Sequence, residues 1–235
     1  MYMMNSTQKE EDLWEAALND NETVINMYEG DINAETPLGN TALHIAASGG
    51  CFNVVKALLD KGAKVDCIDK DALTPLFKAV QDNEELVAEY LISFGATTVG
   101  KDNTDMSLLH WAAKNGMNII VEKLLSNKDL GRLQIVDLKD DGGKTPLHFA
   151  CHYGHLLVVQ QLLRFGANPS SKDEIHWTPL HEAAFWNNLS VVRYLLEVGA
   201  DINPVTKDGE TPLNFSHYSG NAAISEFLRR NGAIQ

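Results

Sequence analysis

Histidine is the residue type in this chain whose spacing most readily suggests chemistry, because an imidazole can ligate a metal or move a proton. Four histidines recur along the sequence, namely His44, His110, His148 and His181. They occupy the same place in separate segments, so they are not expected to converge on one ion, as a metal site requires. His152 follows His148 at helical spacing, but no carboxylate or cysteine completes a ligand set with them. We predict no metal site and no cofactor.

Two short motifs resemble catalytic signatures but each lacks a required residue. The sequence HEAA at 181–184 begins like the H-E-x-x-H motif of zinc proteases, but Phe185 stands where the second histidine belongs. The sequence GKT at 143–145 resembles the end of a phosphate-binding loop, yet Leu138 occupies the position of its first glycine. A nucleophile elbow and a G-x-G-x-x-G motif are also missing. The chain is therefore predicted not to be an enzyme.

The elements that carry these residues repeat along the chain. Threonine or serine heads six similar segments, at positions 41, 74, 107, 145, 178 and 211, so successive heads are 33, 33, 38, 33 and 33 residues apart. Such a period indicates a stacked solenoid, in which each unit buries its apolar face against its neighbours. The Asp- and Gly-rich segments between units, such as 140–143 and 206–209, predict projecting β-turns or hairpins.

Each unit predicts two short helices. In the fourth unit Thr145 can cap the first helix, the following proline suits its first turn, and Gly154 can close it in a left-handed conformation. Apolar residues then fall on one face of each helix. In this unit they are Leu147, Ala150 and Cys151 in the first helix and Val158, Val159, Leu162 and Leu163 in the second.

The T-P-L-H-x-A signature and the 33-residue period together resemble the ankyrin repeat. The resemblance covers about residues 10–233 and implies an all-α solenoid of stacked helix-turn-helix units with projecting β-turn or hairpin loops. It implies a flexible terminus at 1–9 and a single ankyrin repeat domain at 10–235, which opens with a degenerate capping repeat at 10–35. The six further repeats start near 36, 69, 102, 140, 173 and 206.

The chain departs from the ankyrin pattern at several positions. Phe77 and Asn214 replace the histidine, which in ankyrin repeats bonds backbone groups of the adjoining turn. Five added residues lengthen the connection at 126–140, where either a plain loop or a functional loop fits. An enzyme or ligand-binding site in that loop, near 131–134, is an alternative, although no paired acid and base or metal set lies nearby in the sequence.

Charge narrows the classes of partner. The chain has 235 residues and a net charge of -13, and residues 1–40 hold nine carboxylates against Lys9 alone. Binding to a nucleic-acid backbone needs clustered Lys and Arg, so no nucleic-acid partner is predicted. The acidic block fits either a solvated cap or a docking face for a basic partner.

The cysteines and the apolar runs of the sequence indicate the cellular compartment of the protein. The three cysteines are odd in number and form no C-x-x-C pair, which favours a reducing intracellular compartment. We find no signal-peptide pattern and no apolar run near the ~18 residues of a membrane span. We predict a monomeric cytoplasmic protein without membrane contact, and a nuclear location is also compatible.

The surface gives the strongest functional indication. In ankyrin repeats the hairpins and the outer ends of the first helices line one concave face. Polar residues occupy most of these positions in the first repeats, whereas aromatic and other large residues occupy them in the last three. The predicted partner-binding residues are Tyr153, Ile175, Trp177, Phe185, Trp186, Tyr218, His152 and Glu174. Trp and Tyr dominate protein-binding hot spots. The alternative is that some of these rings, Phe185 especially, pack between repeats.

The function that this resemblance implies is that of a protein-interaction scaffold or adaptor. Acidic residues near the aromatic positions favour a partner with a basic and apolar segment. Two alternatives stay open: a targeting or substrate-recognition fragment of a larger multidomain protein, and an inhibitor of an enzyme.

Overall fold

The computed structural model describes residues 6–127 and 135–234, and within them it contains fourteen helices. The chain separates into two compact parts, Met1–Asn103 and Thr104–Gln235, here called the N-terminal unit and the C-terminal unit. The predicted all-α fold is confirmed.

The N-terminal unit contains two rows of helices, because each helix packs on its counterpart in the next repeat. The first helices α1, α3 and α5 contact one another in sequence, and the second helices α2, α4 and α6 form the other row. The bounds are α1 Ser6–Leu18, α2 Glu22–Met27, α3 Ala42–Ser48, α4 Phe52–Asp60, α5 Pro75–Gln81 and α6 Glu85–Phe94. Helix α1 begins inside the segment 1–9 that the sequence assigned to the terminus.

The C-terminal unit has the same two-row arrangement over four repeats. The first helices α7, α10, α12 and α14 pack in order, and so do the second helices α8, α11, α13 and α15. The bounds are α7 Leu108–Asn115, α8 Asn118–Ser126, α10 Pro146–Tyr153, α11 Leu156–Arg164, α12 Pro179–Phe185, α13 Leu189–Glu197, α14 Pro212–Tyr218 and α15 Ala222–Arg230. We number the repeats headed at 41, 74, 107, 145, 178 and 211 as repeats 1 to 6.

The helices begin and end as the sequence predicts. At the start of α10, the backbone N–H of Thr145 donates to His148 Nδ1 at 3.1 Å, and Pro146 occupies the first helical position. This reciprocal cap satisfies backbone groups that a helix start would otherwise leave unpaired. Gly154 closes the helix with φ +76°, a left-handed conformation that favours glycine.

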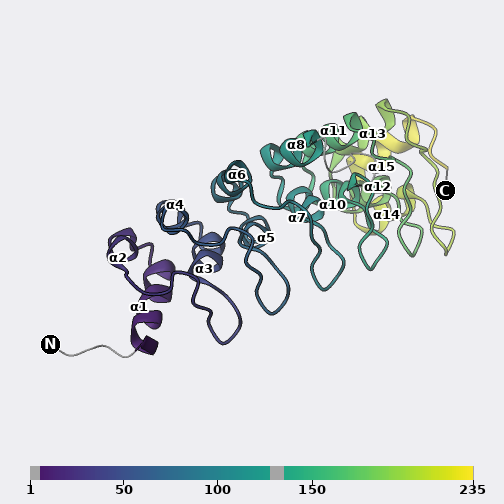
Figure 1. The fold of residues 1–235 in the computed structure, drawn as a ribbon. Coiled ribbons are helices and arrows are strands. Elements are labelled where there is room, and N and C mark those ends of the chain that lie inside the picture. The colour runs from purple at the N-terminus through teal and green to yellow at the C-terminus, as the bar shows by residue number, and fades with distance from the viewer. Residues whose placement is uncertain (1–5, 128–134, 235) are drawn as a thin grey trace. The chain divides into compact units, whose positions relative to one another are not determined.

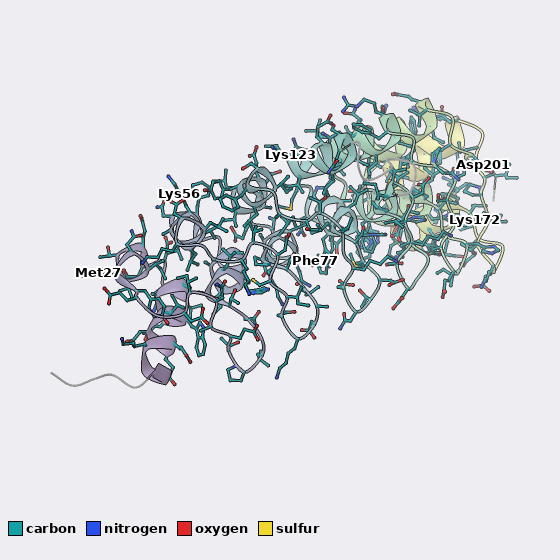
Figure 2. All side chains as sticks on the ribbon, viewed as in Figure 1. Met27, Lys56, Phe77, Lys123, Lys172 and Asp201 are labelled. Atoms are coloured by element: carbon teal, nitrogen blue, oxygen red, sulfur yellow. The ribbon has the colours of Figure 1, made fainter. Side chains whose placement is uncertain are left out.

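The core lies between the two rows of each unit. Leu147, Ala150 and Cys151 on α10 are fully buried, as the sequence predicts. On α11, Val158, Val159 and Leu162 are buried, while Leu163 is half-buried. Figure 2 shows side chains filling the space between the helices, with Phe77 on α5.

The loops between repeats are hairpins that project to one side of the helices within each unit (Figure 1). Neighbouring hairpins of the C-terminal unit are joined by backbone bonds, from Glu174 N–H to the carbonyl of Gly142 at 3.0 Å and from Lys207 N–H to the carbonyl of Ile175 at 3.2 Å. These bonds fix the spacing of the hairpins that precede α10, α12 and α14.

Residues 128–134 of the predicted insertion lie outside the described residues, and with them the whole of the alternative site near 131–134. Among the helices that the structure describes, none is long and apolar enough to cross a membrane.

Candidate functional site

The predicted binding residues come from the ends of first helices and from one hairpin of the C-terminal unit. His152 and Tyr153 end α10, Phe185 ends α12 and is followed by Trp186, and Tyr218 ends α14. The hairpin before α12 supplies the other three, Glu174, Ile175 and Trp177.

The rings among these residues form one continuous series of contacts, which we call the aromatic cluster. In repeats 4 and 5 it consists of Tyr153, His152, Trp186 and Phe185. Their centroids lie 4.5 Å apart for Tyr153 and His152, 4.3 Å for His152 and Trp186, and 5.2 Å for Trp186 and Phe185. Offset and edge-to-face pairs at such distances stabilise one another beyond their burial. The cluster therefore crosses from repeat 4 to repeat 5.

Phe215 on α14 extends the aromatic cluster into repeat 6. Its ring lies 6.2 Å from Phe185, 4.5 Å from Trp177 and 5.9 Å from Tyr218. Phe215 itself is buried. Phe215 was not among the predicted binding residues, although it stands in the same place of its repeat as Phe149.

Exposure divides the predicted residues into two groups. Tyr153 and Trp186 are each 48% exposed, Ile175 is 54% exposed and Tyr218 is 67% exposed. Trp177, Phe185 and His152 are half-buried, whereas Glu174 is exposed. Partner binding and packing between repeats are therefore both compatible with these residues. The exposed rings lie on a layer of half-buried rings that pack between repeats.

Trp177 lies at the base of its hairpin rather than at the tip. Its carbonyl accepts from Asp173 N–H at 3.0 Å, so residues 174–176 form the tip. The same carbonyl accepts from His148 Nε2 at 3.1 Å. With its ring against Phe215, Trp177 serves packing between repeats.

A buried carboxylate lies beneath the exposed rings. Glu182 on α12 is 1% exposed, and its two oxygens contact Lys144 Nζ at 2.7 Å and His152 Nδ1 at 3.0 Å. Burial acts to raise the pKa of Glu182, but the hydrogen bond from His152 and the charge of Lys144 outweigh it, so this pKa is lowered. The carboxyl is therefore ionised at neutral pH.

Two asparagines, which the sequence analysis missed, hold the helix ends that carry the cluster. Asn188 Nδ2 donates to the carbonyls of Cys151 and His152, both at 2.8 Å. Asn221 Nδ2 donates in the same way to the carbonyls of Ala184 and Phe185, at 2.9 and 2.8 Å. The sequence did contain a signal for this role, because both asparagines stand ten residues after the threonine that heads their repeat.

The four recurring histidines act as backbone links between repeats, as the ankyrin resemblance implies. The Nε2 atoms of His44, His110, His148 and His181 lie 3.0 to 3.2 Å from carbonyls of the next hairpin, those of Leu73, Lys144, Trp177 and Glu210. Burial lowers the pKa of His148 and of His181 to about 4. Within residues 6–127 and 135–234 no three potential ligands gather around a metal position.

The two departures from histidine differ in effect. Asn214 Oδ1 accepts from Thr211 N–H at 2.8 Å, so it keeps the helix cap of the histidine it replaces. Phe77 has no ring nitrogen and can replace neither bond, although Thr74 Oγ1 still accepts from Phe77 N–H at 3.2 Å.

Comparison with known proteins identifies the repeats. The family model described as "Ankyrin repeats (3 copies)" matches residues 13–105, 109–206 and 158–235. The structure resembles the ankyrin repeat domain of human ASB11 with a TM-score of 0.79 and 27% sequence identity, over 95% of this chain and 98% of that one.

Curated relatives match over about half of the chain. SH3 and multiple ankyrin repeat domains protein 2 of Homo sapiens is 33% identical over 137 residues, which are 57% of this chain and 7% of that protein. The B-cell lymphoma 3 protein homolog of Mus musculus is 34% identical over 122 residues, 51% of this chain and 26% of that protein. The matches thus span only a small part of these relatives. Arrays of such repeats present extended surfaces that bind other proteins, and this chain belongs to the ankyrin repeat family.

Proposed function

We propose that this chain is a protein-interaction scaffold or adaptor that binds its partner through repeats 4 to 6 of the C-terminal unit. The observation that carries the proposal is the set of large exposed side chains on that face, Tyr153, Ile175, Trp186 and Tyr218. Large exposed apolar side chains gathered on one surface are typical of interaction sites. Aromatic anchors supply much contact area at a low cost in conformational entropy.

The support beneath these residues favours binding as well. The helix ends that carry Tyr153 and Trp186 are fixed by Asn188 and Asn221, and His152 is fixed by Glu182. A surface whose side chains are already positioned loses less entropy when a partner binds. The aromatic cluster therefore has the rigidity expected of a binding hot spot.

Charge indicates the kind of partner. Asp141, Glu174 and Asp208 are exposed on the hairpins that precede α10, α12 and α14. Carboxylates at the rim of an apolar patch favour a partner with Lys or Arg next to an apolar residue. We therefore propose a protein segment of that composition as the occupant, with no nucleic acid.

A bait experiment tests this proposal. Wild-type protein, Trp186→Ala and Gln81→Ala would be immobilised and exposed to the same cell extract, and retained proteins identified by mass spectrometry. Gln81 is the control because it ends α5 in the N-terminal unit, next to Asp82, which takes the place of Trp186 in its repeat. A partner should be retained by wild-type and Gln81→Ala protein and lost on Trp186→Ala.

The affinity of a partner found in this way gives the quantitative test. Loss of a hot-spot tryptophan should weaken binding by about 2 kcal/mol, on the order of thirtyfold. Circular dichroism should show the variant folded as the wild type. Equal binding by all three proteins would remove the C-terminal unit as the proposed site.

A role as the recognition segment of a longer protein is the second candidate. The observation that favours it is the small share of each relative that the match covers, 7% and 26% in the two compared. The same binding face would then direct another domain to its target.

A further inference from the structure

The buried pair of Glu182 and His152 determines which nitrogen of His152 carries hydrogen. Glu182 is ionised, so its oxygens can only accept hydrogen bonds. His152 Nδ1 lies 3.0 Å from one of those oxygens and must therefore donate. In the neutral imidazole this leaves Nε2 without hydrogen, as an acceptor.

The acceptor atom is available to a ligand. Within the described part of the chain, no hydrogen bond to His152 Nε2 is formed. His152 Nε2 is also not buried in the interior. Among the described residues, the buried side-chain nitrogen or oxygen without a hydrogen-bond partner is Gln161 Oε1, so the unpaired Nε2 must be accessible to solvent. About 24% of the His152 side chain is exposed. Nε2 is thus a fixed acceptor at the protein surface.

Two half-exposed rings flank the imidazole that carries this acceptor. The centroid of the His152 ring lies 4.5 Å from that of Tyr153 and 4.3 Å from that of Trp186. A group that binds here must therefore donate a hydrogen bond and also lie against aromatic faces. The exposed carboxylates Glu174 and Asp141 on the adjacent hairpins favour a positive charge.

Arginine combines these properties better than any other side chain. Its guanidinium is planar, stacks on aromatic rings, is always charged and presents several N–H donors in its plane. We propose that His152 Nε2 and the face of Trp186 together recognise an arginine of the partner segment. This inference rests on the proposed function, since it names the side chain that the aromatic cluster selects.

A displayed library of random 12-residue peptides provides the test. It would be panned at pH 7.5 on wild-type, Trp186→Ala and His152→Asn protein. The asparagine amide can still donate to Glu182 but places no acceptor at the position of Nε2. Wild-type protein should enrich peptides with arginine next to an aromatic or aliphatic residue.

Measured affinities of one enriched peptide then decide the inference. His152→Asn should weaken its binding at least tenfold, and so should replacement of its arginine by citrulline, which keeps the shape and loses the charge. The citrulline comparison on wild-type protein remains a test even if the variant folds poorly.

The possible failures are distinguishable. If wild-type protein enriches peptides without arginine and Trp186→Ala loses them, the proposed function stands and the arginine inference is overturned. If Trp186→Ala retains the same peptides as wild type, the proposed function falls too. Undiminished affinity in His152→Asn overturns the role of Nε2.

Discussion

The two units use the same repeat framework but end their first helices differently. In the N-terminal unit, Ser48 at the end of α3 donates to Asp82 beyond α5 at 2.5 Å, and Lys78 pairs with Asp69 at 2.9 Å. The polar side chains at these places are thus paired with one another by a hydrogen bond and an ion pair. In repeats 4 to 6 of the C-terminal unit, most of the places equivalent to Ser48 and Asp82 hold partly exposed rings. Because the framework forms with either set, we conclude that folding does not require the exposed rings of Tyr153, Trp186 and Tyr218.

The side chains that hold the ends of the first helices also differ between the two units. Asn188 and Asn221 each donate two amide hydrogen bonds to the ends of α10 and α12. Cys51, in the equivalent place of repeat 1, has only a weakly donating thiol, which contacts the carbonyl of Gly49 in its own turn at 3.7 Å and Asp20 after α1. The C-terminal unit thus fixes the residues it exposes, which is the arrangement expected of a binding surface.

The largest expected effect concerns the cores, in which the two units should be alike. Leu147→Ala and Leu180→Ala should each lower the free energy of unfolding by about 2–5 kcal/mol, because each empties a fully buried site. Leu43→Ala and Leu76→Ala, at the same place in the N-terminal unit, should cost as much. Chemical denaturation measures all four, and a cost under about 0.5 kcal/mol at any of them would contradict the buried register.

The next effect is that of acid, which should act mainly on the C-terminal unit, although burial lowers the pKa of His44 in the N-terminal unit as well. His148 and His181 have pKa values of about 4, below the ~6.5 of an unfolded histidine, so folding favours their neutral forms. Their contribution is complete above pH 6.5 and is lost as pH falls to about 4, on the order of 3 kcal/mol for each histidine. Urea midpoints between pH 7 and 4 measure the loss.

A matched variant isolates this acid effect. His148→Asn should make the pH dependence shallower, because asparagine already caps α14 at position 214 without titrating, while His181 keeps its own contribution. A pH profile as steep as that of the wild type would mean that the loss comes from other groups.

The third prediction separates the two tryptophans of the aromatic cluster. Trp177→Ala should destabilise by about 2–3 kcal/mol, because its half-buried ring packs on Phe215. Trp186→Ala should cost less than about 1 kcal/mol, since half of its surface is already exposed. Thermal unfolding of both variants gives the comparison, and equal losses would show that Trp186 also serves packing.

The sequence predicted the fold almost completely, for a physical reason. A motif such as T-P-L-H fixes the cap, the first turn and the buried leucine together, and the 33-residue period then fixes the stacking. Interactions between side chains of different repeats were less predictable. The burial of Glu182 depends on Lys144, thirty-eight residues earlier, and neither residue type reveals the pairing.

Trp177 shows the same limit within the candidate site. Its position directly before Thr178 was correctly assigned to the hairpin, but its depth depends on the size of Phe215 in the next repeat. Position within a repeat therefore predicts which residues reach the face. The neighbouring repeat decides which of them remain exposed, and in this chain that division separates Trp186 from Trp177.

The smallest expected effect tests the support of the aromatic cluster. Asn188→Ala removes two hydrogen bonds to the carbonyls that end α10, and should cost about 1–2 kcal/mol at roughly 1 kcal/mol per bond. Glu84→Ala is the matched control, because Glu84 has the same place in repeat 2 and caps α6 without a side-chain hydrogen bond; it should change stability by less than about 0.5 kcal/mol. Denaturation measures both. Hydrogen exchange should also quicken at the end of α10 in Asn188→Ala, because the turn that carries His152 and Tyr153 loses its anchor. Unchanged exchange there would show that Asn188 does not hold the binding face in place.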